Sequence, residues 1–86
     1  MLPKIDYYAN RDAVKLTTEH LELWYSYHTI VAFRTKVEGL VCCENVWSSS
    51  TGRHLNLIEP EKEKRVAYKL FQALLKAIVT IHIVEQ

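Results

Sequence analysis

Apolar and polar residues alternate along the first half of the chain, as they do in β-strands that bury one face. Residues 14–25 place leucine, valine or tyrosine at every second position for most of their length. β-Branched and aromatic residues then fill positions 29–36, and the chain returns over 40–47 after a short turn at 37–39. We therefore expect residues 29–47 to form an antiparallel hairpin in a small sheet.

The spacing of the apolar residues becomes helical after residue 47. The hydroxyl cluster at 48–51 suits a helix start, because Ser and Thr side chains accept hydrogen bonds from the free N–H groups there, and it predicts a short helix over about 51–58. Pro60 fits the first turn of a second helix. Apolar residues recur at steps of three and four beyond it, so the pattern predicts a main amphipathic helix over about 60–78.

The last residues return to strict alternation. β-Branched residues dominate 79–84, which is compatible with a final strand. The chain has no internal repeat and no low-complexity linker, so residues 1–86 are predicted to form a single domain. Its predicted class is α+β, with a small antiparallel sheet packed against one main C-terminal helix.

The charge balance narrows the classes of function. Eleven Lys and Arg residues face ten Asp and Glu residues, a net charge of +1, which excludes a globally basic nucleic-acid coat and an acidic tail. The most apolar tract, residues 77–84, is far shorter than the roughly twenty residues of a membrane span. Residues 1–15 carry five charges and no signal-peptide pattern. We expect a cytoplasmic protein of the host cell with no membrane partner.

Two adjacent cysteines, Cys42 and Cys43, are the candidate nucleophiles. Neighbouring strand residues point to opposite faces, so no disulfide is expected between them, in keeping with a reducing cytosol. Thiol chemistry would need a histidine such as His54 beside one of them, while the alternative is one buried cysteine and one at the surface or an interface. The six cysteines and histidines show no pair at zinc-ligand spacing, and the sequence predicts no metal, cofactor or catalytic residue.

Basic residues form the candidate nucleic-acid surface. On a continuous helix, Lys62, Arg65, Lys69, Gln72 and Lys76 follow one another at steps of three and four, which places them in one stripe opposite the apolar face. Four cations on one face can neutralise phosphates. The alternative is the ordinary solvated face of a helix.

The hydroxyl cluster offers a second polar surface. Residues 48–51 and Arg53, at a helix N-terminus, would together hold a phosphate, and Arg53 joins the basic stripe as a candidate nucleic-acid contact. The alternative is that these hydroxyls cap the helix and do nothing else.

Five aromatic residues gather around the predicted sheet: Trp24, Tyr25, Tyr27, Phe33 and Trp47. Aromatic side chains on strands can stack unpaired bases. In a chain this small they more often form the core and a dimer interface, and we expect core packing and a homodimer.

Residues 26–56 carry a signature, which reads SYHTIVAF at 26–33, ENVWS at 44–48 and STGRHLN at 50–56. It resembles a family of small uncharacterised proteins encoded by archaeal viruses, phages, plasmids and their integrated relics, in which Thr often stands at the position of Ser50. The resemblance implies a mobile-element origin and brings no established activity. The recurrent positions of that family correspond to Ser26, Tyr27, Thr29, Trp47, Thr51, His54 and Asn56.

Two of these positions, His54 and Asn56, have two physical interpretations. They are hydrogen-bonding anchors that lock the hairpin to the helix start, or they form a polar site. The residues alone do not decide between the two.

The leading hypothesis is a non-enzymatic binding protein of a virus or mobile element. It would be a homodimer that acts through protein–protein contact with a host or viral macromolecule. The alternative is nucleic-acid binding through the basic stripe, and a third hypothesis is an enzyme that uses His54 with Cys42 or Cys43.

Overall fold

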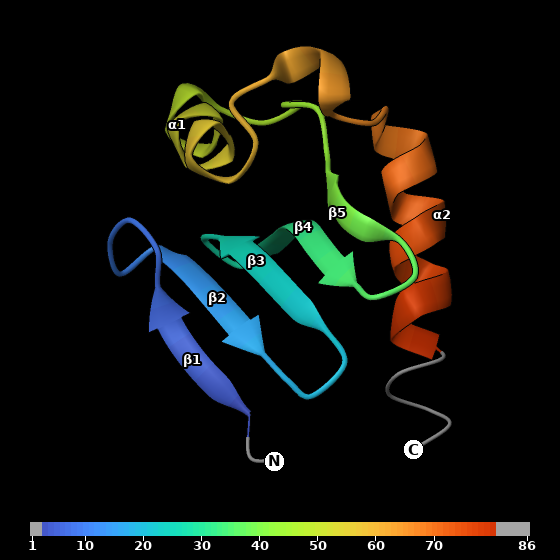
Figure 1. The fold of residues 1–86 in the computed structure, drawn as a ribbon. Coiled ribbons are helices and arrows are strands. Elements are labelled where there is room, and N and C mark those ends of the chain that lie inside the picture. The colour runs from blue at the N-terminus through green and yellow to red at the C-terminus, as the bar shows by residue number, and fades with distance from the viewer. Residues whose placement is uncertain (1–2, 81–86) are drawn as a thin grey trace.

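Five antiparallel strands form the centre of the computed structural model, which describes residues 3–80 of the chain. They lie in the sheet in the order of the sequence, so each strand pairs with the next (Figure 1). Together with the helices they confirm the α+β class. The strands are Lys4–Tyr7 (β1), Ala13–Thr17 (β2), Glu22–Ser26 (β3), Thr29–Thr35 (β4) and Gly39–Cys42 (β5).

The predicted hairpin is present, since β4 and β5 pair antiparallel. Gly39 closes its turn with a φ of 71°, in the left-handed region that glycine adopts without strain. β5 ends at Cys42 rather than at residue 47, because Cys43 forms an isolated parallel bridge with Val66 instead. β1 has no counterpart in the sequence prediction, since four residues are too few for an alternation to stand out.

The first helix, α1, spans Ser49–Ile58, so it begins two residues before the predicted start at 51. Ser48 is its N-cap, and the Ser48 hydroxyl accepts a hydrogen bond from the Thr51 backbone N–H at 3.3 Å. The capping interpretation of the hydroxyl cluster therefore holds for Ser48.

The predicted main helix over 60–78 is wrong in its first half. The structure has a short 3-10 helix at Lys62–Lys64 (η1) and a separate helix at Tyr68–Val79 (α2). Between them the backbone is extended at Arg65 and Ala67. The sheet therefore faces two helices, α1 and α2, rather than one main helix.

Pairing with the sheet edge explains this break. Val66 donates its N–H to the Cys42 carbonyl at 2.8 Å and accepts the Glu44 N–H at 2.8 Å. These two hydrogen bonds keep the segment extended although its side chains suit a helix, because tertiary contacts override helix propensity.

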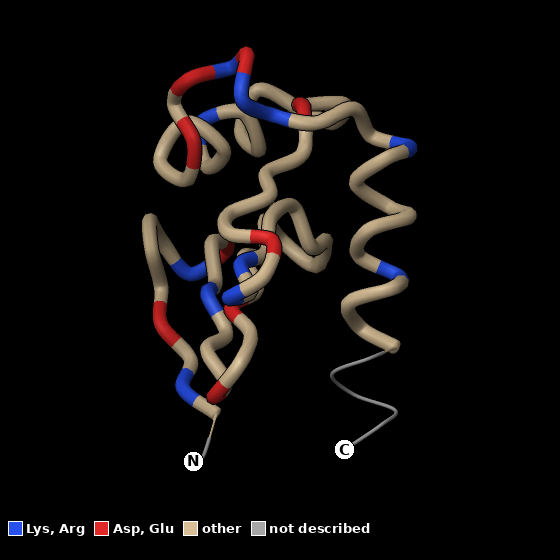
Figure 2. The backbone as a smooth tube through the Cα atoms, turned by 45° about the vertical axis from the view of Figure 1, so that its right-hand side comes forward, with Lys and Arg blue, Asp and Glu red and all other residues tan. Residues whose placement is uncertain are grey.

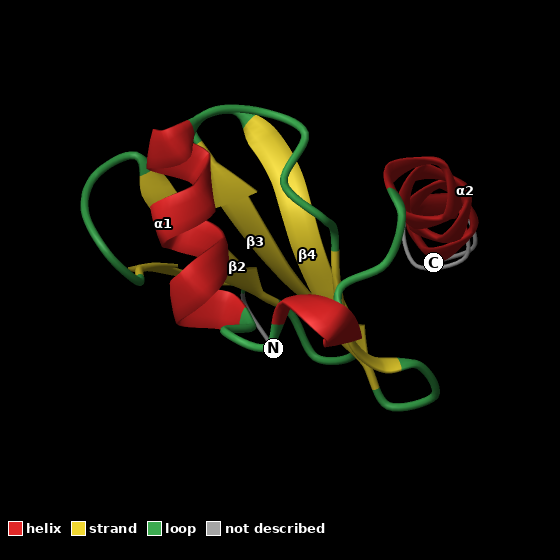
Figure 3. Cartoon of the chain, turned by 90° about the horizontal axis from the view of Figure 1, so that it is seen from above, coloured by secondary structure: helices red, strands yellow, loops and turns green. Residues whose placement is uncertain are grey.

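Alternation along the strands divides the core into two layers, one on each face of the sheet. The α1 face is built around Leu55, and its buried strand residues are Trp24, Val31, Ala32 and Cys42. The α2 face is built around Phe71, and its buried residues on and beside the strands are Leu21, Leu23, Phe33, Val41 and Cys43. Figure 3 shows α1 lying over β2 and β3, and α2 beyond β4.

The predicted final strand over 79–84 cannot be placed in this sheet. Val79 is the last residue of α2, and residues 81–84 lie outside the described residues. Within residues 3–80, no helix combines the length and the apolar character needed to cross a membrane.

Candidate functional site

Two hydroxyl groups and one imidazole meet in a buried polar cluster between β3 and α1, which is formed by Ser26, Thr51 and His54. The Ser26 hydroxyl donates to Thr51 Oγ1 at 2.9 Å and lies 2.7 Å from His54 Nδ1. With the Ser26 proton given to Thr51, the Ser26 oxygen is free to accept a hydrogen bond from His54 in its Nδ1–H tautomer. The cluster joins residues 25 and 28 positions apart, so it fixes α1 to the sheet.

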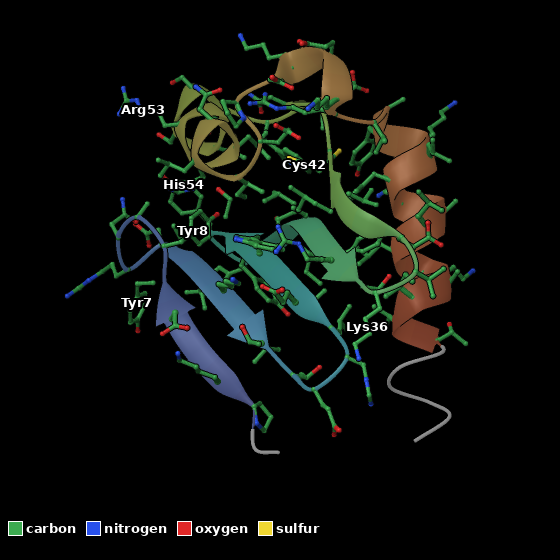
Figure 4. The ribbon with its side chains drawn as sticks, in the orientation of Figure 1. Tyr7, Tyr8, Lys36, Cys42, Arg53 and His54 are labelled. Carbon is green, nitrogen blue, oxygen red and sulfur yellow. The ribbon has the colours of Figure 1, made fainter. Side chains whose placement is uncertain are left out.

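Two tyrosine rings pack against the His54 imidazole. Tyr8 meets it edge-on, with ring centroids 5.9 Å apart, and Tyr27 lies tilted at 5.8 Å. In Figure 4 the Tyr8 side chain points in toward His54, while that of the neighbouring Tyr7 points away. The Tyr8 hydroxyl donates to the Tyr25 carbonyl at 2.8 Å, and burial raises the pKa of Tyr8 to about 12.

Tyr27 adopts an uncommon backbone conformation beside this cluster. Its φ is 58°, a left-handed value that few residues other than glycine adopt. The Tyr27 N–H donates to the Asp12 carbonyl at 2.7 Å, and its ring contacts His54. These contacts hold the strained residue in place.

Burial decides what the polar cluster can do. Ser26 is 2% exposed and His54 is 5% exposed, so the Ser–His pair presents no hydroxyl to a substrate in solution. Its hydrogen bonds are those of an anchor between hairpin and helix, which is one of the two interpretations that the sequence left open.

Asn56 takes part in a second group, which we call the polar cleft. Its Oδ1 accepts a hydrogen bond from Arg65 Nη2 at 2.8 Å, and Arg65 Nε donates to the Glu59 carbonyl at 3.0 Å. The cleft has a volume of about 380 Å³. It is lined by Glu44, Asn45, Gly52, Asn56, Lys62 and Arg65.

The predicted basic stripe is not continuous. Lys62 and Arg65 line the polar cleft, while Lys69 and Lys76 lie exposed on α2, because the chain is extended between η1 and α2. Figure 2 shows blue bands without red ones along α2, whereas blue and red alternate in the segment before it. Arg53 is apart from both groups, on the outer side of α1 and pointing away from the sheet (Figure 4).

An aromatic groove of about 280 Å³ separates α2 from the β3–β4 turn. Trp47 and Tyr68 meet edge-on at its wall, with ring centroids 5.8 Å apart. The signature residues Thr29 and Trp47 therefore contribute here rather than to the polar cluster. The lining residues are Tyr25, His28, Thr29, Ile30, Trp47, Tyr68, Phe71, Gln72 and Leu75.

The strand register shows that the aromatic groove continues into a part of the sheet that the described residues, 3–80, leave exposed. Two cross-strand rows share the α2 face, and they are Ile5–Leu16–Leu23–Phe33–Val41 and Tyr7–Val14–Tyr25–Ile30. We call the β1 and β2 members of these rows, Ile5, Tyr7, Val14 and Leu16, the open half. Ile5 is 65% exposed and Tyr7 is 66% exposed. Sequence reasoning missed this surface because it depends on which strands α2 covers.

On the α1 face, charged side chains from β2, β3 and β4 form a group that we call the charged half, made up of Lys15, Glu22 and Arg34. Glu22 forms ion pairs with Lys15 at 2.6 Å and with Arg34 at 3.7 Å. The same two cations lie over the Trp24 ring, at 4.8 and 5.6 Å from its centroid. The charged half is therefore better suited to contact with water than to an apolar partner surface.

Both cysteines are buried, which corrects the expectation that one of them lies at the surface. Cys42 belongs to the α1 face and Cys43 to the α2 face, as alternation along a strand predicts. Burial raises the pKa of Cys42 to about 11 and that of Cys43 to about 12. Protonated, buried thiols are poor nucleophiles at neutral pH. Within the described part of the chain, no three His, Cys, Asp or Glu side chains gather as they would around a metal ion.

Comparison with known proteins gives a family without an assigned function. The family of unknown function DUF8033 matches residues 4–73, which is most of the chain, so the protein belongs to this family. No curated protein and no solved structure matches the sequence. The family match carries no information on the viral or plasmid origin that the signature implies, which stays a prediction. It spans the whole polar cluster and polar cleft, but ends within α2.

Proposed function

We propose that this protein is a non-enzymatic binding module that holds an acidic amphipathic helix of a partner protein on the open half of its sheet. The contrast between the open half and the charged half carries this proposal. The charged half has ion pairs over Trp24, whereas the two rows of the α2 face contain no charged residue. Apolar side chains left exposed in one contiguous patch are typical of protein-binding surfaces.

The dimensions of the sheet favour a helix as the occupant. Strands lie about 4.8 Å apart, so five strands span roughly 19 Å, and a helix with its side chains is about 10 Å wide. α2 packs through Phe71 and Ile78 and covers the region of β4 and β5. The open half therefore has room for one further helix beside α2, with the aromatic groove between the two.

Charge favours acidic flanks on that helix. Lys69 and Lys76 lie three residues before and four residues after Gln72, which lines the groove, so the three share one side of α2. Neither lysine has a carboxylate within ion-pair distance among the residues described, and α2 contains no acidic residue. Glu or Asp side chains beside the partner's apolar stripe would complement them.

A second copy of the chain is the competing occupant, because the sequence predicts a homodimer. A second copy that docked its α2 on the open half would bring the same two exposed lysines, Lys69 and Lys76. Repulsion between like charges makes this arrangement less favourable than an acidic partner. A partner supplied by the host or by a mobile element is compatible with the mobile-element origin that the signature implies.

The test compares two synthetic amphipathic helices that share one leucine stripe and differ in their flanks, Glu in one and Lys in the other. Each labelled peptide is titrated with the wild-type protein, with Tyr7→Asp and with Val37→Asp, and fluorescence anisotropy gives the Kd. Val37 is the matched control, since it is 92% exposed in the β4–β5 turn, away from the open half. We expect the Glu peptide to bind about tenfold more tightly than the Lys peptide, and Tyr7→Asp to weaken it about tenfold.

Two results would overturn the proposal. One is equal binding of both peptides, or of neither, by the wild-type protein. The other is a dimer in sedimentation that Tyr7→Asp dissociates, which would assign the open half to a second copy. An unchanged affinity in Val37→Asp, together with the loss in Tyr7→Asp, supports the proposed surface.

A further inference from the structure

We propose that the polar cleft binds the phosphate group of a small, mononucleotide-sized ligand. It lies between α1, η1 and the loop that follows β5, and its volume of about 380 Å³ falls in the range of small-molecule sites, about 300–1,000 Å³. Two cationic side chains, Arg65 and Lys62, line it together with amide groups. The cleft shares no residue with the open half.

Arg65 is already oriented for recognition. Its Nε donates to the Glu59 carbonyl at 3.0 Å and its Nη2 to Asn56 Oδ1 at 2.8 Å, so two of its five N–H groups are used. None of the ion pairs among residues 3–80 involves Arg65, so its charge is not neutralised by a carboxylate. A guanidinium held in this way can offer its remaining N–H groups to a phosphate without losing side-chain freedom.

The two lysines of η1 differ in a way that favours a ligand. Lys64 forms an ion pair with Glu61 at 2.6 Å. Lys62 lines the cleft and forms none within the described part of the chain. The cation that faces the cleft is thus the one left to bind an anion, while its neighbour is neutralised.

Amide groups complete the donor set. Because Asn56 Oδ1 faces Arg65, the Asn56 amide N–H groups are directed elsewhere and can serve the cleft. Asn45, another lining residue, is fixed by hydrogen bonds to Trp47 N and Ser48 O. A Cβ at Gly52 would lie 2.9 Å from Asn45 Nδ2, so glycine is what allows α1 to pass this close to the Asn45 amide.

One carboxylate, that of Glu44, also lines the cleft and opposes an anion. Its Oε2 accepts the Tyr68 N–H at 2.9 Å, at the N-terminus of α2. The partial positive charge of a helix N-terminus offsets part of its negative charge. Because the lining holds two cations, Lys62 and Arg65, and this one carboxylate, it keeps a net positive charge.

The test is a ¹H–¹⁵N NMR titration with AMP, inorganic phosphate and a single-stranded oligonucleotide. It uses the wild-type protein, Lys62→Gln and Lys64→Gln. The last is the matched control, because it removes the same charge two residues away on the same short helix. We expect AMP to shift the signals of Gly52, the Asn56 amide and Arg65 Nε, with a Kd that Lys62→Gln raises about fivefold and Lys64→Gln leaves unchanged. Inorganic phosphate should shift the same signals at higher concentration.

Three outcomes would overturn this inference. AMP and phosphate at millimolar concentration could leave the cleft signals in place. Lys62→Gln and Lys64→Gln could weaken binding equally, which would indicate diffuse electrostatic attraction. The oligonucleotide could bind much more tightly than AMP with shifts along Lys69 and Lys76, which would indicate a nucleic-acid surface. Because the cleft shares no residue with the open half, failure of phosphate binding is distinguishable from failure of the proposed protein-binding function.

Discussion

The hydroxyl of Ser26 joins two side chains of α1, those of Thr51 and His54, inside the protein. Among the residues described, no buried side-chain nitrogen or oxygen lacks a hydrogen-bond partner. Removal of the Ser26 hydroxyl would leave both Thr51 and His54 without this hydrogen-bond partner. Because both side chains are buried, water does not replace the lost contacts. An unpaired buried polar group costs more than a typical hydrogen bond gains.

We therefore expect Ser26→Ala to lower the free energy of unfolding by about 2 kcal/mol. Urea denaturation followed by tryptophan fluorescence measures this change. Ser49→Ala is the matched control, since Ser49 is an exposed serine in the first turn of α1, and its effect should stay within about 0.5 kcal/mol. A Ser26→Ala variant as stable as wild type would show that the cluster does not anchor α1.

The buried thiols predict a loss of stability at alkaline pH. A cysteine exposed to water in the unfolded chain ionises near pH 9.0, whereas burial holds the pKa values of Cys42 and Cys43 at about 11 and 12. The folded state thus binds protons more tightly, so its extra stability is complete below pH 9 and is lost as the pH rises toward 11 to 12.

Iodoacetamide alkylation at pH 8 checks the same property of the thiols directly. Because only the thiolate reacts, the rise in the pKa of Cys42 from 9.0 to about 11 slows its reaction about 100-fold in the native protein relative to the urea-unfolded chain, and the higher pKa of Cys43 slows that thiol further. Comparable alkylation rates in the native and unfolded protein would contradict the burial of the cysteines and would support the hypothesis of a thiol enzyme.

How far the sequence predicts residue roles depends on how local the interaction is. The Ser48 cap was predictable because a cap acts within three residues. The sequence singled out His54 as an anchor or a polar site. The tyrosine rings that pack against it, those of Tyr8 and Tyr27, come from two turns that are distant from His54 along the chain. No spacing rule connects residues so far apart along the chain.

At the scale of elements, α2 is capped by a residue from elsewhere in the chain. Ala67 precedes the helix and has no side-chain hydrogen bond to offer. Glu44, 24 residues earlier, accepts the Tyr68 N–H in its place. The negative charge of this carboxylate also interacts favourably with the partial positive charge at the N-terminus of the helix.

Glu44→Ala should accordingly destabilise the protein by about 1 kcal/mol, the usual cost of losing a helix cap. Glu38→Ala provides the control, because Glu38 is an exposed residue of the β4–β5 turn whose carboxylate has no partner among the ion pairs of the described residues. Thermal or urea unfolding distinguishes the two. Equal effects of both substitutions would mean that the cap contributes nothing.

The break before α2 shows why the sequence could not fix the helix boundary. Residues 66–78 have helical apolar spacing, and Pro60 suits the first turn of a helix that would lead into them. The extended Val66 instead satisfies backbone groups at the end of β5, at Cys42 and Glu44, which are more than twenty residues away. The predicted basic stripe requires one continuous helix over residues 60–78. Because η1 and α2 are separate helices, that prediction is also wrong.

At the scale of the whole molecule, one helix packs on each face of a five-stranded sheet, and among the described residues neither helix covers its whole face. The two remaining regions differ in chemistry, with ion pairs in the charged half and apolar side chains in the open half. The α+β class and the alternation of β2 to β5 were predictable from the sequence. Which strands stay uncovered was not, because that depends on where the connection from η1 places α2.

The most direct test of the proposed function is an NMR map of the Glu-flanked helical peptide on the ¹⁵N-labelled protein. We expect the largest shifts at Ile5, Tyr7, Val14 and Leu16, with smaller ones along Gln72 and Lys76. Shifts confined to the charged half or to α1, or none at all, would contradict the assignment of the open half as the binding surface.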